Sequence, residues 1–445
     1  MSLDARPGVL AVITAATALA LAAFSSPLTT LEAMTASLQL TVGQQAWVMS
    51  AMPLAAAAGL LTAGALGDTL GRRRTFVAGL WLTVMASALA ALAGGGATLI
   101  AARLLQGLGI AGIMACGLGL LGQAYDGPAR QRAAGIWAAG LGAGVALGPI
   151  LSSALLPLGD WRAVHGAVAV VAGGLALQGP RVLPESVPTG LRVDWLGSLL
   201  LMLGLGGLLA ALTGLRLGPS WPLAGLVVAA LLLLAAFVVV ELRLANPILD
   251  VRLFRESAFA GATLAAFASG AGVLAIMSLV PTALERGAGL APLAAALVLL
   301  AWSGVTVVSA LGARRLPAGL SARQRTIGAI IGCTLAQVML LELGLAQVWW
   351  AALPGLLTAG IANGVLNAAL GHSAVQSVPP ERAAMGSAAN NTARYMGSAI
   401  GIAAGSMLMA RGGGALGTGW AAAVGVTVAF SLLGLAAMAL FGRDG

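Results

Sequence analysis

Charged residues are scarce in this sequence, and lysine is missing altogether. Only 8% of the 445 residues are charged, and the 23 basic residues, all of them arginine, outnumber the 14 acidic ones. A water-soluble protein needs roughly a quarter of its residues charged to cover its surface. The composition therefore excludes a large soluble enzyme. The net charge of +9 does not indicate nucleic-acid binding either, because the arginines lie singly or in short runs between apolar segments.

Residues that form disulfide frameworks or hold metals are equally scarce. The two cysteines, Cys116 and Cys333, lie in apolar stretches far apart in the sequence, and His165 and His372 are the two histidines. This spacing predicts neither a disulfide framework nor a metal site. No loop holds a cluster of catalytic side chains. We therefore expect no metal, no other cofactor and no enzymatic activity.

Apolar residues are abundant instead. They make up 59% of the sequence, and the mean hydropathy is +0.98. About 20 apolar residues are needed to span a bilayer core of roughly 30 Å. Charged residues and Pro/Gly clusters divide the chain into fourteen such segments, which predicts an all-α polytopic membrane protein. The predicted spans are 8–31, 46–66, 75–94, 97–121, 133–157, 162–180, 194–214, 222–241, 258–281, 291–312, 326–345, 347–371, 383–408 and 419–441.

The arginines test this count. If the N-terminus lies inside, 17 of the 23 arginines fall in inside loops and four in outside loops, while Arg103 and Arg394 fall within spans. Arginine is enriched on the cytoplasmic side of membrane proteins, and a wrong span count would destroy the asymmetry. The pattern predicts that both termini are cytoplasmic. The first segment lacks a small-residue cleavage site, so we expect an uncleaved span and not a signal peptide.

Two features recur eight spans apart. An Ala-Leu-Gly segment followed by arginines ends both the second and the tenth span. Glycines at every fourth position line one face of the fifth and thirteenth spans, where another backbone can approach closely. The offset predicts six spans, two inserted spans and six more, a repeat typical of secondary transporters. The predicted units are 1–182, 183–257 and 258–445, and the glycines are Gly140, Gly144, Gly148, Gly397, Gly401 and Gly405.

The residues of the loop after the second span each have an expected structural role. We expect Gly64 to allow tight packing and Gly71 to permit a sharp turn. Asp68 can accept hydrogen bonds from the N–H groups at the start of the third span, or pair with a neighbouring arginine. A simple positively charged anchor would explain Arg72 and Arg73, but not the aspartate and its glycines.

This loop resembles the conserved loop between spans 2 and 3 of the major facilitator superfamily. Two further segments are similar to motifs of that family. Arg103, Gln106 and Gly107 in the fourth span match its Arg-x-x-Gln-Gly element. Gly144, Gly148 and Pro149 in the fifth span match the motif associated with its antiporters, although Ser152 and Ser153 follow where two glycines are usual.

Fourteen spans, together with the segments 241–255 and 378–394, resemble the drug:proton antiporter branch of the family. The resemblance implies the major facilitator fold, with two six-helix bundles and two inserted central helices. It also implies a monomer in the bacterial cytoplasmic (inner) membrane that exports amphipathic small molecules or drugs in exchange for protons. The branch commonly has an aspartate midway through span 1, but this chain has none near Ala23.

A proton-coupled carrier needs a group that takes up and releases a proton. Glu32, near the outer end of the first span, is the first candidate, and Glu342 in the eleventh span is the second. Arg103 lies about six residues into its span and needs a partner or a water-filled cavity. We interpret it as a pathway or coupling residue, with snorkelling to the interface as the alternative. We expect Glu285 to pair with Arg286.

Arg394 lies midway through the thirteenth span, beside Asn390 and Asn391. This polar stripe either lines the central cavity or clasps two helices near the cytoplasmic gate, and the sequence leaves both interpretations open. The serines and threonines around Pro27 can satisfy the carbonyl groups that a proline frees, or line the same cavity.

Two other functions stay open. The first is a major facilitator carrier for another cargo, such as a lipid, a metabolite or a siderophore. The second is a non-transporting membrane scaffold or sensor, which the sequence favours less because no soluble domain is evident to report a signal.

Overall fold

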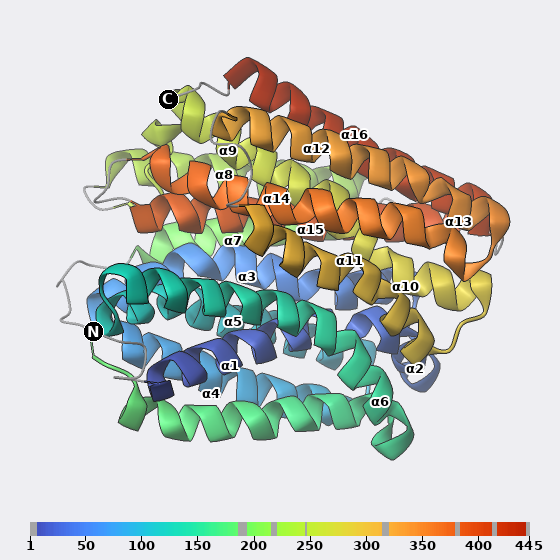
Figure 1. Cartoon of the computed structure of the whole chain (residues 1–445), viewed down its shortest axis with the longest axis horizontal. Coiled ribbons are helices and arrows are strands. Elements are labelled where there is room, and N and C mark those ends of the chain that lie inside the picture. The colour runs from blue at the N-terminus through green and yellow to red at the C-terminus, as the bar shows by residue number, and fades with distance from the viewer. Residues whose placement is uncertain are drawn as a thin grey trace.

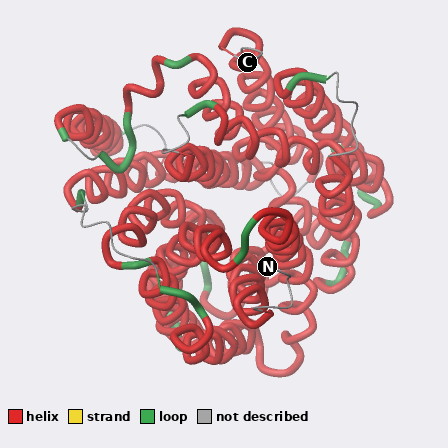
Figure 2. The backbone as a smooth tube through the Cα atoms, turned by 60° about the vertical axis from the view of Figure 1, so that its left-hand side comes forward, coloured by secondary structure: helices red, strands yellow, loops and turns green. Residues whose placement is uncertain are grey.

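The computed structural model describes residues 7–185, 194–214, 220–244, 247–313, 320–378, 383–411 and 416–441. All regular elements in these ranges are helices (Figure 2). The helices run roughly side by side, so the molecule has two ends (Figure 1). We call the end that carries residues 71–74 the inner end, and the opposite end the outer end. The predicted all-α class is confirmed.

The first part of the chain forms helices α1 to α6. The helix is interrupted between α1 and α2 at Ser26, directly before Pro27. The nitrogen of Pro27 has no hydrogen to donate to the preceding turn. The long element α6 covers two predicted spans. Its backbone leaves the helical conformation between them, at Gly159 and Asp160. These helices are α1 (Pro7–Ser25), α2 (Pro27–Leu38), α3 (Val42–Leu70), α4 (Arg72–Ala91), α5 (Gly96–Ala124) and α6 (Gly127–Val182).

Helices α7 (Trp195–Gly214) and α8 (Trp221–Arg243) follow and pack against each other. In the last part of the chain, a short π-helical turn at Gly270–Leu274 joins α9 to α10. The elements there are η3 (Val251–Arg255), α9 (Ser257–Ser269), α10 (Ala275–Ala288), α11 (Pro292–Gly312), α12 (Ala322–Met339), α13 (Leu341–Ala346), η6 (Trp349–Ala352), α14 (Leu353–Gln376), α15 (Ala383–Arg411) and α16 (Leu416–Phe441).

Local sequence explains several helix ends. Thr41 and Gln44 form a capping box at the start of α3, in which each side chain accepts a hydrogen bond from the other residue's backbone N–H. Gly71 separates α3 from α4 with a φ of 103°, in the region that favours glycine. The sharp turn predicted at Gly71 is therefore confirmed.

Within the described residues, twelve helical segments are long and apolar enough to cross a membrane. One of them, Arg132–Val182, contains the break at Gly159 and so spans two predicted segments. Helix α15 coincides with the predicted span 383–408 but is not among the twelve, because polar residues lower its mean hydropathy. The exact number of fourteen spans stays a prediction.

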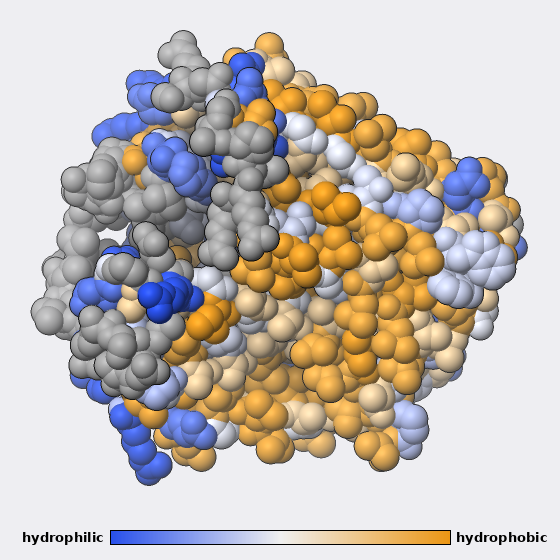
Figure 3. Space-filling view, in the orientation of Figure 1, coloured by the Kyte–Doolittle hydropathy of each residue, from blue (hydrophilic) through white to orange (hydrophobic). Residues whose placement is uncertain are grey.

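The side of the bundle is apolar. Figure 3 shows a broad hydrophobic face between the two ends of the molecule, with hydrophilic residues gathered mainly at the inner end. Many large apolar side chains are exposed on the helices, such as Leu231 and Leu232 on α8. Helices with apolar outer faces and internally satisfied backbones are what a bilayer requires. The protein is a multi-pass membrane protein.

Both glycine faces pack against another backbone. A Cβ atom added to Gly148 on α6 would lie 2.6 Å from the carbonyl oxygen of Ala22 on α1, too close for a real side chain. Gly401 on α15 lies equally tightly against Ala271, in the π-helical turn after α9. The close approach predicted for both faces is confirmed, and the partner is the first predicted span of each half in both cases.

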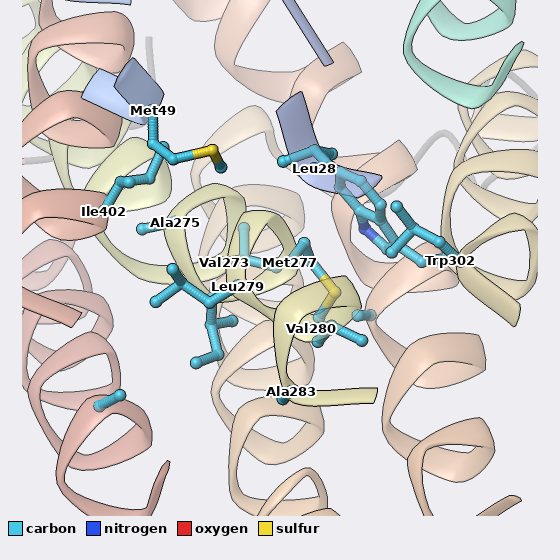
Figure 4. Close-up of a cluster of buried hydrophobic side chains, with 14 of the residues drawn as sticks. Leu28, Met49, Val273, Ala275, Met277, Leu279, Val280, Ala283, Trp302 and Ile402 are labelled. Atoms are coloured by element: carbon cyan, nitrogen blue, oxygen red, sulfur yellow. The ribbon is translucent and has the colours of Figure 1, made fainter. Parts of the chain in front are cut away.

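The first and last parts of the chain also pack against each other. Helix α3 lies along α15, and α6 lies along α11. Near the outer end, one apolar cluster contains residues from both parts (Figure 4). Leu28 and Met49 come from the first part, and Met277, Leu279 and Trp302 from the last. The boundaries of the three predicted units stay a prediction.

Candidate functional site

The predicted loop motif forms ion pairs at the inner end. Asp68 and Arg72 are four positions apart, on either side of Gly71. A carboxylate oxygen of Asp68 lies 3.1 Å from an Nη atom of Arg72. This is the second of the two partners expected for Asp68. The prediction for Gly64 is wrong, since nothing lies near a Cβ atom added there. The close approach occurs one turn later, where a Cβ on Gly67 would lie 2.7 Å from the sulfur of Cys116 on α5.

Arg73 ties this loop to the end of α6. Its Nε donates to a carboxylate oxygen of Glu185 at 3.1 Å, and its Nη1 donates to the carbonyl of Pro180 at 3.2 Å. Arg74 lies 3.7 Å from the same carboxylate. The loop after α3 is therefore joined to the segment that follows the predicted sixth span. Glu185 carries no sequence signal that would have identified it as this partner.

Arg103 is fully buried and is held by neutral oxygen atoms. It donates to the carbonyls of Ala23 at 2.8 Å, Phe24 at 3.2 Å and Val48 at 3.3 Å. Pro27 has no N–H to offer to the carbonyl of Ala23, four residues earlier, so the break between α1 and α2 leaves acceptors for the guanidinium. Arg103 therefore joins three helices, and the snorkelling alternative is wrong.

Gln106 and Gly107 support the same junction. The Gln106 carbonyl oxygen accepts from Arg103 at 3.0 Å, and its amide nitrogen donates to Ser87 at 2.9 Å. The amide nitrogen also lies 3.3 Å from Nδ1 of the fully buried His165. Gly107 lets α5 approach α3, because a Cβ there would lie 2.8 Å from that of Ala55. No sequence pattern predicted that His165 would lie in this network.

Glu32 pairs with Arg286 at the outer end, where α2 and α10 meet. The Nε of Arg286 donates to the Glu32 carboxylate at 2.6 Å, and its Nη2 donates to the side-chain oxygen of Gln45 at 3.2 Å. The expected pair between Glu285 and Arg286 is wrong. Arg286 instead contacts the first part of the chain, and one buried oxygen of Glu285 has no hydrogen-bond partner.

Glu342 is exposed on α13 at the outer end. No hydrogen bond or ion pair between described residues joins it to Glu32 or Arg103, and no carboxylate within the described residues contacts the Arg103 guanidinium. The coupling roles of these three residues stay predictions.

The antiporter motif joins α6 to the start of the chain. Gly144 and Gly148 lie against α1, and the carbonyl of Pro149 accepts from the hydroxyl of Thr29 on α2 at 3.1 Å. Ser152, where a glycine is usual, lies 3.2 Å from the same Thr29 hydroxyl. The serine thus adds a polar contact between α6 and α2 where a glycine would only allow close approach.

The polar stripe of α15 divides between two neighbours. Asn390 donates to the carbonyl of Ala262 on α9 at 3.3 Å, which is the clasp between helices that was one of the two interpretations. Arg394 instead donates to the side-chain oxygens of Asn367 on α14 at 2.9 Å and Asn391 at 3.3 Å. Arg394 is half-buried, and its Nε has no partner. Asn367 lay outside the predicted set.

Comparison with known proteins identifies the family. The sequence model described as Major Facilitator Superfamily matches residues 12–402. The chain belongs to this superfamily. Major facilitator proteins are transporters, so the chain is a transporter of small molecules.

Curated relatives of this major facilitator transporter are bacterial resistance and efflux proteins. The chain is 29% identical to the methylenomycin A resistance protein of Bacillus subtilis, over 82% of this chain and 80% of that protein. It is 30% identical to the multidrug efflux pump LfrA of Mycolicibacterium smegmatis (81% and 72%) and 32% identical to the puromycin resistance protein pur8 of Streptomyces alboniger (80% and 72%). The predicted resemblance to major facilitator proteins of the multidrug-efflux type is confirmed.

A solved structure gives the same fold. The human organic anion transporter MFSD10 superposes with a TM-score of 0.64 over 96% of this chain and 98% of its own. At 16% sequence identity this likeness shows the major facilitator fold alone.

Proposed function

We propose that this transporter exports amphipathic small molecules from the bacterial cytoplasm in exchange for protons, by alternating access. The names of its relatives support the cargo class, since they include resistance to methylenomycin A and puromycin and multidrug efflux. We place the protein in the cytoplasmic membrane as a monomer, with both termini inside. In support, α1 begins and α16 ends at the inner end (Figure 1), which also carries Arg72, Arg73 and Arg74.

The observation that carries the proposal is the ion pair between Glu32 and Arg286. It joins α2 to α10, so it connects the two predicted bundles, 1–182 and 258–445, at the outer end. If these bundles rock about the centre, opening of the outer end must break the pair. A proton on Glu32 removes its negative charge and with it most of the attraction to Arg286. Proton uptake from outside and outward opening therefore favour each other.

The inner loop supplies the opposite gate in this proposal. Asp68, Arg72 and Arg73 hold α3, α4 and the segment after α6 together at the inner end. These contacts are ion pairs on half-exposed side chains, which can break and reform at modest cost. The described inner contacts join elements of the first part of the chain, so we propose that they fix the loop against which the last part closes.

Replacing Glu32 by Gln tests the coupling step, because it keeps the size of the side chain and removes the titrating group. We expect methylenomycin A added to proteoliposomes of the purified Glu32→Gln variant to drive no more than a tenth of the wild-type proton movement. Glu342→Gln is the matched control, and we expect a smaller loss because this carboxylate is exposed and away from the interface. Proton movement retained in the double variant would show that neither carboxylate couples, and would contradict the proposal.

A further inference from the structure

We infer that the cargo of this transporter is an amphipathic organic anion, and that Arg394 binds its negative group. The inference rests on the proposed function, which it deepens by naming the charge of the cargo and the residue that selects it.

The positive charge of Arg394 is not compensated by a carboxylate. Its two hydrogen-bond partners are the neutral side chains of Asn367 and Asn391. None of the ion pairs between described residues includes Arg394. Its buried Nε has no partner at all, although a guanidinium offers five N–H donors. An unpaired charge in a membrane helix is costly and marks a substrate or ion pathway.

The comparison with Arg103 separates a structural arginine from a binding one. Arg103 is fully buried, and backbone and amide oxygens at the break before Pro27 surround its guanidinium. Arg103 is not exposed, and its N–H groups already donate to these oxygen atoms, so it cannot bind a ligand. Arg394 lies twelfth in the 29-residue helix α15, near its middle, and still keeps partial exposure. Of the two arginines within spans, only Arg394 is open to a ligand.

Aromatic side chains lie beside this charge, on the contact between the two parts of the chain. The guanidinium carbon of Arg394 is 5.7 Å from the ring centre of Tyr395. The Tyr395 ring in turn lies 6.0 Å from the ring of Phe24 on α1. Two residues before Arg394 on α15, Thr392 donates to the carbonyl of Ala57 on α3 at 3.1 Å. Carriers of this kind hold their cargo between their two repeats, near the membrane midplane.

Among the described residues, no acidic side chain beside Arg394 is available to attract a cationic cargo. The position near Ala23 on α1 carries no carboxylate. Of the described carboxylates, Glu32 and Glu285 lie at the outer end of the molecule and Asp68 at the inner end, away from the middle of α15. A second cation would be repelled in the low dielectric between the helices, whereas an anion would compensate Arg394. A planar guanidinium also pairs well with a carboxylate, through two parallel hydrogen bonds.

Two xanthene dyes of similar shape and opposite charge test the assignment. Binding of fluorescein, an anion, and of rhodamine 123, a cation, is measured by fluorescence anisotropy on the full-length protein in detergent. We expect the wild type to bind fluorescein at least tenfold more tightly than rhodamine 123. Arg394→Gln should weaken fluorescein binding at least tenfold and leave rhodamine 123 binding unchanged or stronger. Arg394→Lys, which keeps the charge, should retain most of the fluorescein affinity.

Arg323→Gln is the matched control, because Arg323 also donates to two neutral oxygens but lies between α12 and the end of α16, away from Tyr395. We expect it to bind both dyes like the wild type. A preference of the wild type for the cation, equal losses for both dyes in Arg394→Gln, or no binding of either dye would overturn the assignment. No proton gradient is present in detergent, so failure of proton coupling would leave this result unchanged.

Discussion

At the scale of single residues, we expect the Asp68–Arg72 pair to matter for movement and not for folding. The two side chains are 43% and 32% exposed and join adjacent turns at the α3–α4 junction. Exposed pairs of this kind contribute about 0–1 kcal/mol to stability. Their value in the proposed cycle lies in the inner gate, which a neutral partner would weaken.

We therefore predict that Asp68→Asn sharply reduces transport, to below a tenth of the wild-type rate, and leaves the protein inserted and folded. Transport of methylenomycin A into inside-out proteoliposomes and thermal unfolding of the same preparation measure the two effects. Asp160→Asn is the matched control, since Asp160 pairs with Arg162 at 2.9 Å with similar exposure but at the outer end. A wild-type transport rate in Asp68→Asn would sink the gating role.

How far the sequence predicts these residues depends on how local their partners are. Asp68 and Arg72 are only four positions apart, so the loop motif predicted this pairing as one of two alternatives. Arg103 was expected to need a partner, but its actual acceptors are backbone carbonyls, which no side-chain pattern reveals. The partner of Glu32 lies 254 positions away, on a helix whose packing only the three-dimensional structure determines.

At the scale of elements, the two glycine faces define equivalent helix pairs in the two parts of the chain. Gly144 and Gly148 bring α6 onto α1, and Gly397 and Gly401 bring α15 onto α9 and the turn after it. The four-residue spacing of the glycines predicted these faces, because residues four apart share one side of a helix. Their partners could not be read from the spacing. The face of α6 turns out to lie inside the predicted first bundle, not between bundles.

The position of this face gives a prediction about stability. Gly148→Leu places a side chain against Ala22 and Ser25 of α1, which should cost about 1–3 kcal/mol, as overpacking does in soluble cores. We expect a lower unfolding temperature for the purified variant. Gly174→Leu, on the same helix where nothing lies near an added Cβ atom, is the control and should unfold like the wild type. Equal unfolding temperatures for the two variants would show that α1 and α6 separate easily.

At the scale of the whole molecule, alternating access requires two bodies that separate at the outer end. The contacts that hold this end closed include the Glu32–Arg286 pair and the apolar cluster of Figure 4, both of which contain residues from both parts of the chain. The same end has a small cavity of about 30 Å³, lined by Val42 and Gln45 from α3 and by Arg286 and Ala410 from α10 and α15. Outward opening should enlarge this cavity.

Reversible locking of the outer end tests alternating access most directly. Val42 and Ala410 are exposed, line the small cavity from the first and last parts of the chain, and take no part in the Glu32–Arg286 pair. Both are replaced by Cys in a background where the two buried native cysteines, Cys116 and Cys333, are replaced by Ala. A bifunctional methanethiosulfonate reagent then joins them. We predict that methylenomycin A transport in proteoliposomes is lost on cross-linking and restored by reduction, while each single-cysteine variant is unaffected. Full transport by the cross-linked protein would contradict the account.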